Sequence, residues 1–328
     1  MDPAAILANA LRAALGPSAA AYALLAIGLN FHFGYTGLLN FGQVGFMLLG
    51  AYGVAVTVTV FGGSLWLGLV VSLLLSVGLA LLLGAPTLRL RADYLAITTI
   101  AAAEILRFAF RASPSRDLTG GVFGLSGFAA EFNALNPYTG GLQIGLLAYN
   151  ERQLWVLTVG WALVALAVGL TYLLSRSPWG RALKAIREDE DAARSLGKNV
   201  FGYKMQSLVL GGVLGALGGV VFALNLQSVH PDTFLPLLTF YFYTILILGG
   251  AATVLGPVIG SVIFWFLMAG MDATLRQAGA AGYMPDWFGA DALGAVRFLV
   301  VGIGLMLLMI YRPQGIFGDR RELALNVR

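Results

Sequence analysis

The sequence predicts an all-α protein that crosses a membrane many times. Hydrophobic residues make up 59% of the chain and charged residues only 11%, whereas a soluble domain carries roughly a quarter charged residues to keep its surface hydrated. The apolar residues form runs such as 65–85 and 154–174, each about 20 residues long, as a helix must be to cross a hydrocarbon layer. Membrane β-strands would alternate in polarity, and these runs do not. The 43 glycines suit close packing of membrane helices.

Hydropathy predicts about nine transmembrane helices, with a range of 8–10. They fall at 18–35, 39–61, 65–87, 94–111, 153–175, 204–226, 237–252, 256–275 and 293–311. The seventh and eighth are the weakest, because Gly249, Gly250, Gly256 and Pro257 interrupt the apolar sequence. They form either two short helices or one broken, re-entrant element, which is tolerated only where it is buried in protein or lines a cavity. Segment 1–15 lacks the basic start of a cleavable signal peptide, and we expect a short amphipathic helix there.

Three hydrophilic segments interrupt this single membrane domain of residues 1–328. They are a long loop at 112–152, a charged loop at 176–203 and a polar tail at 312–328. Basic residues gather in the charged loop, in the tail and in the turn after the third span. With nine spans these regions share one side of the membrane, which the positive-inside rule makes cytoplasmic. We therefore expect the C-terminus inside, and the N-terminus and the 112–152 loop outside.

The composition also excludes several kinds of site. The chain has no cysteine, which rules out disulfides, thiolate metal sites and cysteine nucleophiles. The net charge of +4 is small, and its location points to membrane orientation and not to nucleic acid. His32 fits a satisfied interior histidine, and no cluster of His, Asp or Glu suggests a metal, a cofactor or an enzyme. No phosphate-binding loop is present, because Gly197 and Lys198 lack the required glycine spacing and hydroxyl residue.

The charged segment 177–197 predicts two short helices. Pro178 suits the first turn of a helix, Asp189 is a suitable N-cap for a second helix, and Gly197 is a natural C-terminal stop. From these residues alone, the segment is either a solvated loop that orients the protein or a docking element for another protein.

A resemblance to a known family favours docking. The spacing Asp191-Ala192-Ala193-x-x-x-Gly197 resembles the EAA-loop signature of ABC import permeases, with Asp in place of the usual Glu. The wider string 177–204 resembles that loop in LivM-type permeases of branched-chain amino acid importers. Further segments match the same family in order, at 34–52, 88–107, 118–125, 248–260 and 311–316. The similarity extends over residues 22–318, while 128–152 matches no family motif.

The resemblance implies an ABC importer permease bundle, in which the 176–203 loop carries the coupling helix that docks on an ATPase. It places these residues at that contact: Arg181, Ala185, Arg187, Glu190, Asp191, Ala192, Ala193 and Gly197. It also implies a bacterial or archaeal cytoplasmic membrane, surrounding lipid, a second permease as heterodimer partner, two cytoplasmic ATPase subunits and a periplasmic binding protein. The implied cargo is a branched-chain or related hydrophobic amino acid, with urea or a short amide as the alternative.

Several residues are candidates for lining the transport pathway. They are Asn40, Gln43, Glu104, Arg107, Gly249, Gly250, Gly256 and Pro257. Glu104 and Arg107 lie one helical turn apart and can neutralise each other; charges at membrane depth are often functional, and a structural ion pair is the alternative. The broken region at 249–260 either lines a pathway or is a kinked packing element.

Other classes of protein find less support in the sequence. A proton-coupled secondary transporter would need a relay of buried acids, and Glu104 is the single candidate. A scaffold would not need so many glycines at pathway-like positions. Gly211, Gly215 and Gly219 recur every four residues, which predicts a smooth helix face for tight packing.

Overall fold

The computed structural model describes residues 2–88, 92–145 and 147–281, with short stretches further on at 294–296, 299, 302–303, 306, 310–311 and 314–318. In this part the protein is a bundle of helices with four short strands. The long helices are α1 (Pro3–Ala14), α2 (Pro17–Leu29), α3 (Gln43–Thr59), α4 (Leu65–Thr87), α5 (Ala92–Arg111), α8 (Glu151–Arg176), α11 (Val200–Leu226), α12 (Leu237–Gly249) and α13 (Gly256–Ala280). A π-helix, η1 (Asn30–Tyr35), continues α2.

The first eight predicted spans coincide with these helices. Among the described residues, five helical segments are long and apolar enough to cross a membrane: α4, α8, α11, Pro231–Gly249 and α13. The pair formed by α1 and α2–η1, bent by 44°, would make a sixth. Helix α3 is apolar but shorter, and α5 does not meet the same criteria, because it carries Glu104, Arg107 and Arg111. The predicted ninth span, at 293–311, falls almost wholly outside the described residues.

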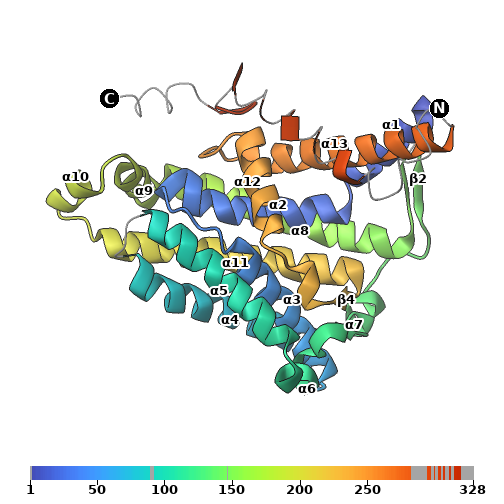
Figure 1. Cartoon of the computed structure of the whole chain (residues 1–328), viewed down its shortest axis with the longest axis horizontal. Helices are drawn as coiled ribbons and strands as arrows, with labels where there is room; N and C mark the ends of the chain where they lie inside the picture. Colours follow the sequence, from blue (N-terminus) through green and yellow to red (C-terminus); the bar gives the residue numbers. More distant parts are fainter. Residues whose placement is uncertain are drawn as a thin grey trace.

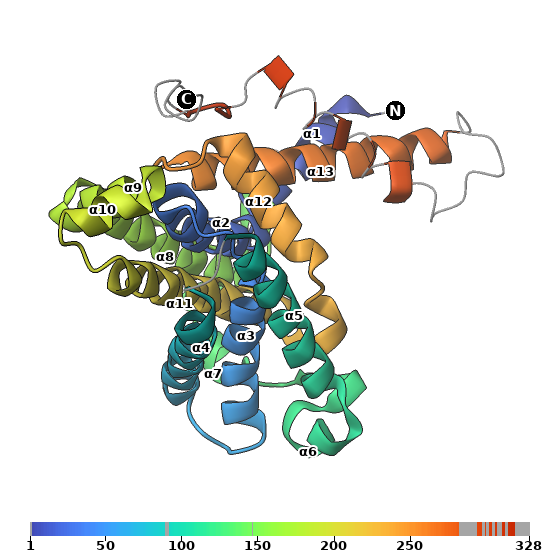
Figure 2. The same ribbon diagram turned by 60° about the vertical axis from the view of Figure 1, so that its left-hand side comes forward.

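The expected amphipathic helix at the N-terminus is α1. The Asp2 carboxylate caps it by accepting from Ala4 N at 2.9 Å, and Ala10 and Ala14 are its buried residues. Helix α1 lies along α13 on one flank of the molecule, while α3, α4 and α5 form the opposite flank (Figure 2). The Asp2 backbone N–H donates to Gln277 Oε1 at 2.7 Å and so joins α1 to α13.

The core lies where α11 crosses α2 and α3. From Ala19 to Leu29 every residue of α2 is buried. The predicted packing stripe on α11 faces this crossing: a Cβ at Gly215 would lie 2.6 Å from Gln43 Nε2, and one at Gly219 would collide with the Met47 carbonyl. In contrast, α4 and α8 expose large apolar side chains such as Leu82 (72%) and Leu166 (70%), as helices in contact with lipid do.

The two ends of the bundle are built differently (Figure 1). One end carries two short helices, α9 (Pro178–Glu188) and α10 (Glu190–Ser195). The opposite end carries η2 (Ser113–Ser115), α6 (Arg116–Thr119), η3 (Gly121–Phe123), β1 (Leu125–Ser126), α7 (Ala130–Ala134), β2 (Leu142–Ile144), β3 (Leu147–Tyr149), β4 (Ser228–Val229) and η4 (Pro231–Thr233). The antiparallel pairing of β1 with β4 joins the 112–152 loop to the α11–α12 connection, so these two segments share an end, as nine spans require.

Candidate functional site

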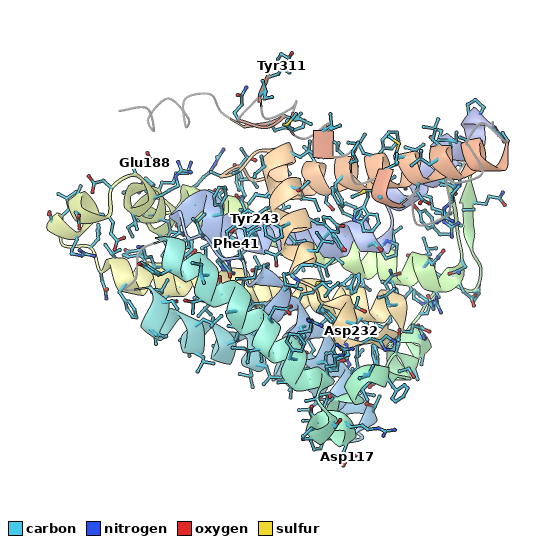
Figure 3. The ribbon with its side chains drawn as sticks, viewed as in Figure 1. Phe41, Asp117, Glu188, Asp232, Tyr243 and Tyr311 are labelled. Carbon is cyan, nitrogen blue, oxygen red and sulfur yellow. The ribbon has the colours of Figure 1, made fainter. Side chains whose placement is uncertain are left out.

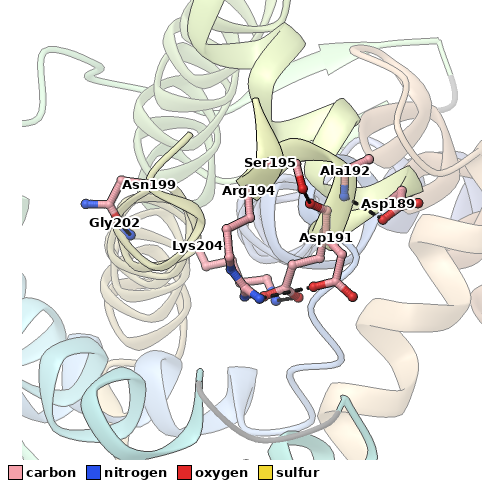
Figure 4. A network of polar contacts seen from close by, with 9 residues as sticks. Asp189, Asp191, Ala192, Arg194, Ser195, Asn199, Gly202 and Lys204 are labelled. Atoms are coloured by element: carbon pink, nitrogen blue, oxygen red, sulfur yellow. Dashed lines mark hydrogen bonds and ion pairs between the residues drawn. The ribbon is translucent and has the colours of Figure 1, made fainter. Parts of the chain in front are cut away.

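The charged loop folds as the two short helices that the sequence predicts. Ser177 caps α9 by accepting from Gly180 N at 3.3 Å. The Asp189 carboxylate caps α10 by accepting from Ala192 N at 2.9 Å, as Figure 4 shows. Gly197 follows α10 with a φ of +77°, a conformation that glycine adopts without the steric cost of a Cβ. These helices therefore begin and end where the local sequence signals predict.

Helix α9 is anchored to the bundle by its inner face. Leu183 is completely buried and Ile186 is 3% exposed. Trp179 Nε1 donates to Gln206 Oε1 on α11 at 2.7 Å, and Arg187 Nη1 donates to the Gly34 carbonyl in η1 at 2.6 Å. Arg187, expected at a partner contact, thus reaches into its own bundle. Movement of α9 must therefore carry η1 and the start of α11 with it or break these bonds.

Helix α10 is held by one apolar contact and a set of ion pairs. Ala193 is 3% exposed and packs with Ile186 and Val200. Glu190 accepts from Arg194 Nη2 at 2.9 Å and forms an ion pair with Lys204 of α11 (Figure 4). Like Arg187, Glu190 bonds the loop to the rest of the bundle, and its side chain is 38% exposed. Ala193 holds the loop from inside.

Only some of the residues predicted at the ATPase contact lie on the outward surface of the loop. Arg181, Ala185, Asp191, Ala192 and Gly197 are exposed. Sequence reasoning missed Leu196, whose side chain is 81% exposed, the largest value among the exposed large hydrophobic residues that the structure describes. Its signal in the sequence is a lone leucine in a charged loop, directly before the glycine that ends the helix. An apolar side chain amid small residues fits contact with a partner protein.

Asn40 and Gln43, two of the pathway candidates, lie in a closed polar network with His32. All three side chains are fully buried. His32 Nε2 must donate to the Leu208 carbonyl, which can only accept, at 3.1 Å. His32 Nδ1 is therefore unprotonated and accepts from Asn40 Nδ2 at 3.0 Å.

The rest of this network satisfies Gln43. Asn40 Nδ2 also donates to Gln43 Oε1 at 3.2 Å, and Gln43 Nε2 donates to the Gly211 carbonyl at 3.3 Å. Tyr243 OH donates to the Asn40 carbonyl at 3.1 Å, and its ring stacks on Phe41 (Figure 3). In this conformation the network ties α3 to η1, α11 and α12 and lines no open passage. Within the described residues no group of three or more His, Cys, Asp or Glu could hold a metal.

Glu104 and Arg107 belong to a larger ionic cluster at the β1–β4 end. Arg107 donates to both carboxylate oxygens of Glu104 at 2.9 and 2.8 Å, and its Nη1 bonds Asp232 Oδ1 in η4 at 2.9 Å. Arg111 Nε also approaches Asp232, at 3.4 Å. The Arg107 side chain is 8% exposed. Asp232 was not predicted, because 125 residues separate it from Arg107, and no local sequence pattern indicates a partner so distant in the chain.

The glycine-rich break at 249–256 separates two helices, and the helical segment on each side of it is long and apolar enough to cross a membrane. Helix α12 ends at Gly249, Gly250 has a φ of +112°, and α13 begins at Gly256 with Pro257 in its first turn. Thr253 Oγ1 donates to the Gly250 carbonyl at 2.7 Å and accepts from Gly256 N at 3.0 Å. The chain near the C-terminus covers this break, since Ile316 N and Phe317 N donate to the Leu248 and Gly249 carbonyls at 3.0 and 3.1 Å.

These features define a multi-pass helical membrane protein with an anchored pair of short helices at one end. Residues 14–310 match the family described as branched-chain amino acid transport system / permease component. The chain is 30% identical over 307 residues to the high-affinity branched-chain amino acid transport system permease protein LivM of Salmonella typhimurium, covering 90% of this chain and 67% of that protein. The probable LivM permease of Methanocaldococcus jannaschii is 24% identical over 342 residues, with 91% of each chain covered.

A third relative points the same way. The high-affinity branched-chain amino acid transport system permease protein BraD of Pseudomonas aeruginosa is 25% identical over 320 residues, covering 90% of this chain and 91% of that protein. The chain belongs to the family of branched-chain amino acid transport permease components. The resemblance of the chain to LivM-type permeases is thereby confirmed, and the chain is a multi-pass protein of the cell membrane.

Proposed function

We propose that this chain is the membrane permease of an ATP-driven importer and passes branched-chain amino acids into the cell. The observation that carries the proposal is the anchored α9–α10 pair with its exposed Leu196, in a chain of the branched-chain amino acid permease family. The chain acts as a transport subunit and not as an enzyme. Its partners are a second permease, two cytoplasmic ATPase subunits and a periplasmic binding protein. The relatives named for branched-chain amino acids favour that cargo over urea or a short amide.

We place the α9–α10 end in the cytoplasm and the β1–β4 end outside. Seven of the chain's basic residues lie within 176–204, and cytoplasmic loops are the ones enriched in Lys and Arg. The residues at 316 and 317 bond to the α12 end near η1, which puts this part of the C-terminal region at the same end as α9. The 112–152 loop would then meet the binding protein.

The ATPase would contact the outward surface of the loop, formed by Ala185, Ala192, Leu196 and Gly197. Small residues allow a partner backbone to approach closely, and Leu196 supplies an apolar anchor for a pocket. Because Arg187 and Glu190 bind the loop to η1 and α11, a push on this surface moves helices and not a flexible loop. ATP-driven rigid-body motion would in this way change access to the pathway.

The outer part of the pathway would run along α5. A helix whose partly exposed side carries Glu104 is costly to place against lipid and suits an aqueous passage or a second permease. Arg107 links it to η4, the segment that leads into α12. We propose this α5–η4 contact as part of the outer gate.

Co-purification with candidate ATPase subunits tests the docking surface. We expect Leu196→Asp and Ala185→Trp to lose the ATPase while the permease is still produced, because both alter exposed positions without touching the core. Leu118→Asp is the matched control, since Leu118 is also an exposed leucine (44%) but lies at the opposite end. Equal ATPase retention by all three variants would remove the basis of the proposed coupling surface.

A further inference from the structure

The segment after α2 has an unusual backbone. At Asn30 the helix changes from α to π, and η1 runs to Tyr35. Leu38 N, which would bond the Gly34 carbonyl in a continuing α-helix, donates instead to the His32 carbonyl at 2.8 Å. Short π-helical turns in α-helices are frequently found at functional sites. The helix ends here, since Gly37 has a φ of +73°, and the Gly34 carbonyl in its last turn is available to a side chain.

That carbonyl receives the charged side chain that comes from the coupling loop. Arg187 Nη1 donates to Gly34 O at 2.6 Å, and the arginine stem lies beside Gly37, where a Cβ would be only 3.1 Å from Arg187 Cγ. The Arg187 side chain is 19% exposed, so this contact is largely shielded from water. Charge-assisted hydrogen bonds of this kind are stronger than neutral ones.

The residue at the start of η1 contacts the break between α12 and α13. The side chain of Asn30 is completely buried and bonds two backbone groups there: it accepts from Ala252 N at 2.8 Å and donates to the Thr253 carbonyl at 2.8 Å. Ala252 has a φ of +59°, which is uncommon for a residue other than glycine. The paired bonds from Asn30 thus fix a backbone turn that would otherwise be disfavoured.

Gly34 joins the two contacts. Its carbonyl binds Arg187, while a Cβ on it would lie 2.6 Å from Ala252 N and would collide with Asn30 Oδ1. No larger residue fits without displacing the break from η1. A single glycine therefore lies between the coupling loop and the α12–α13 break.

We propose that η1 transmits motion of the ATPase-docking loop to the α12–α13 break, with Asn30 and Gly34 as its positioning residues. The proposal rests on the proposed function, because that function supplies the motion. The segment has an alternative α form, in which each N–H would bond the carbonyl four residues back and not five, and this change would turn one flank about 100° against the other. That rotation would carry the Gly34 carbonyl away from Arg187. The same rotation would withdraw Asn30 from residues 252 and 253.

One change in η1 would thus break both the bond from Arg187 to Gly34 and the bonds from Asn30 to the break. Both ends bias the same two-state element, which is the physical requirement for coupling between separate sites. The break opens or closes in step with the loop because it is bonded to the same turn.

Hydrogen exchange on the purified full-length chain tests this connection without any transport assay. We expect Arg187→Met to speed exchange in the peptide around Ala252 by about tenfold, although Arg187 bonds Gly34 of η1 and the bonds to the break come from Asn30. Arg181→Met, on the same helix but bonded to the Arg176 carbonyl, should leave that peptide unchanged. Unchanged exchange in Arg187→Met, or equal acceleration in both variants, would overturn the proposal.

A coupling measurement completes the test. The complete transporter in proteoliposomes would be assayed for leucine uptake and ATP hydrolysis together. Asn30→Ala should keep stimulated hydrolysis and lower the uptake per ATP by about tenfold. Ser261→Ala is the matched control, because Ser261 is equally buried and bonds the Ala19 carbonyl of α2 at 2.8 Å. If uptake and hydrolysis fall in proportion, Asn30 is merely structural; if wild type shows no ATP-driven uptake, the proposed function itself fails.

Discussion

At the scale of single residues, the fold depends on a few buried polar side chains whose partners are fully specified. Asn40 illustrates this, since its amide nitrogen serves both His32 and Gln43 while its amide oxygen accepts from Gly42 N at 2.9 Å. Each of these groups is removed from water, so loss of one partner leaves another unsatisfied. The network thereby selects one arrangement of the α2–α3 turn against α11.

The first prediction concerns Asn40→Ala. We expect it to lower the free energy of unfolding by about 2–4 kcal/mol, because the His32 and Gln43 acceptors and the Gly42 N–H lose a partner. Thermal unfolding of the purified protein in detergent measures the effect. Thr57→Ala is the control, because the Thr57 hydroxyl bonds only the Gly53 carbonyl of its own helix at 2.7 Å. Equal melting temperatures for the two variants would contradict this account.

The second prediction concerns the cluster around Arg107. Glu104→Gln or Asp232→Asn alone leaves Arg107 one carboxylate, so we expect each to cost only about 1 kcal/mol. The double variant leaves a nearly buried guanidinium without a carboxylate partner in the cluster, and its cost should exceed the sum of the single costs by about 1–3 kcal/mol. A double-mutant cycle on thermal stability measures this difference. Simple additivity would show that the cluster is not a coupled unit.

The sequence predicted part of this residue-scale detail. Asp189 and Gly197 were identified as the start and end of α10 because helix caps are local signals. Asp232 as partner of Arg107, and the inward direction of Ala193 beside the outward Ala192, depend on contacts between distant segments. Leu196 was missed because a lone leucine carries no periodic pattern.

At the scale of elements, apolar run length located the helices well, since a membrane requires about 20 apolar residues for each crossing. Helix α4 begins and ends at the predicted residues, 65 and 87. The π-helix η1 lies within the predicted first span and was not predicted, because hydropathy gives no information on hydrogen-bond register. For the same reason the sequence left open whether the 249–256 break lies between two helices or within one re-entrant element. The structure has two helices, α12 and α13, on either side of it.

The third prediction concerns how α10 is attached to α11. We expect Lys204→Met to weaken ATPase retention several-fold, because the Lys204 side chain is 12% exposed and its partner Glu190 then loses its bond to α11. Arg194→Met is the control: Arg194 is 61% exposed, and surface ion pairs contribute only about 0–1 kcal/mol. Quantified co-purification of the ATPase distinguishes the two variants. If Arg194→Met is the more harmful change, attachment to α11 does not set the position of α10.

At the scale of the whole molecule, one end presents the α9–α10 pair and the other the β1–β4 pair with the ionic cluster, as expected for a chain that meets different partners on the two sides of a membrane.

The fourth prediction concerns the orientation of these two ends in the membrane. The chain has no cysteine, so single cysteines can be introduced as labels. Phe123→Cys should react with a membrane-impermeant maleimide in intact cells, whereas Leu196→Cys should react only after the membrane is opened; both positions are highly exposed. The reverse labelling pattern would show that the chain has the opposite orientation in the membrane.

The most direct test of the central claim is leucine uptake by proteoliposomes that contain this chain with its second permease, the ATPases and the binding protein. The account predicts accumulation that requires ATP and the binding protein, is unaffected by collapse of the proton gradient, and is lost in Leu196→Asp. Uptake that continues without ATP and follows the proton gradient would contradict it and would instead indicate a secondary transporter, with Glu104 as the first residue to examine.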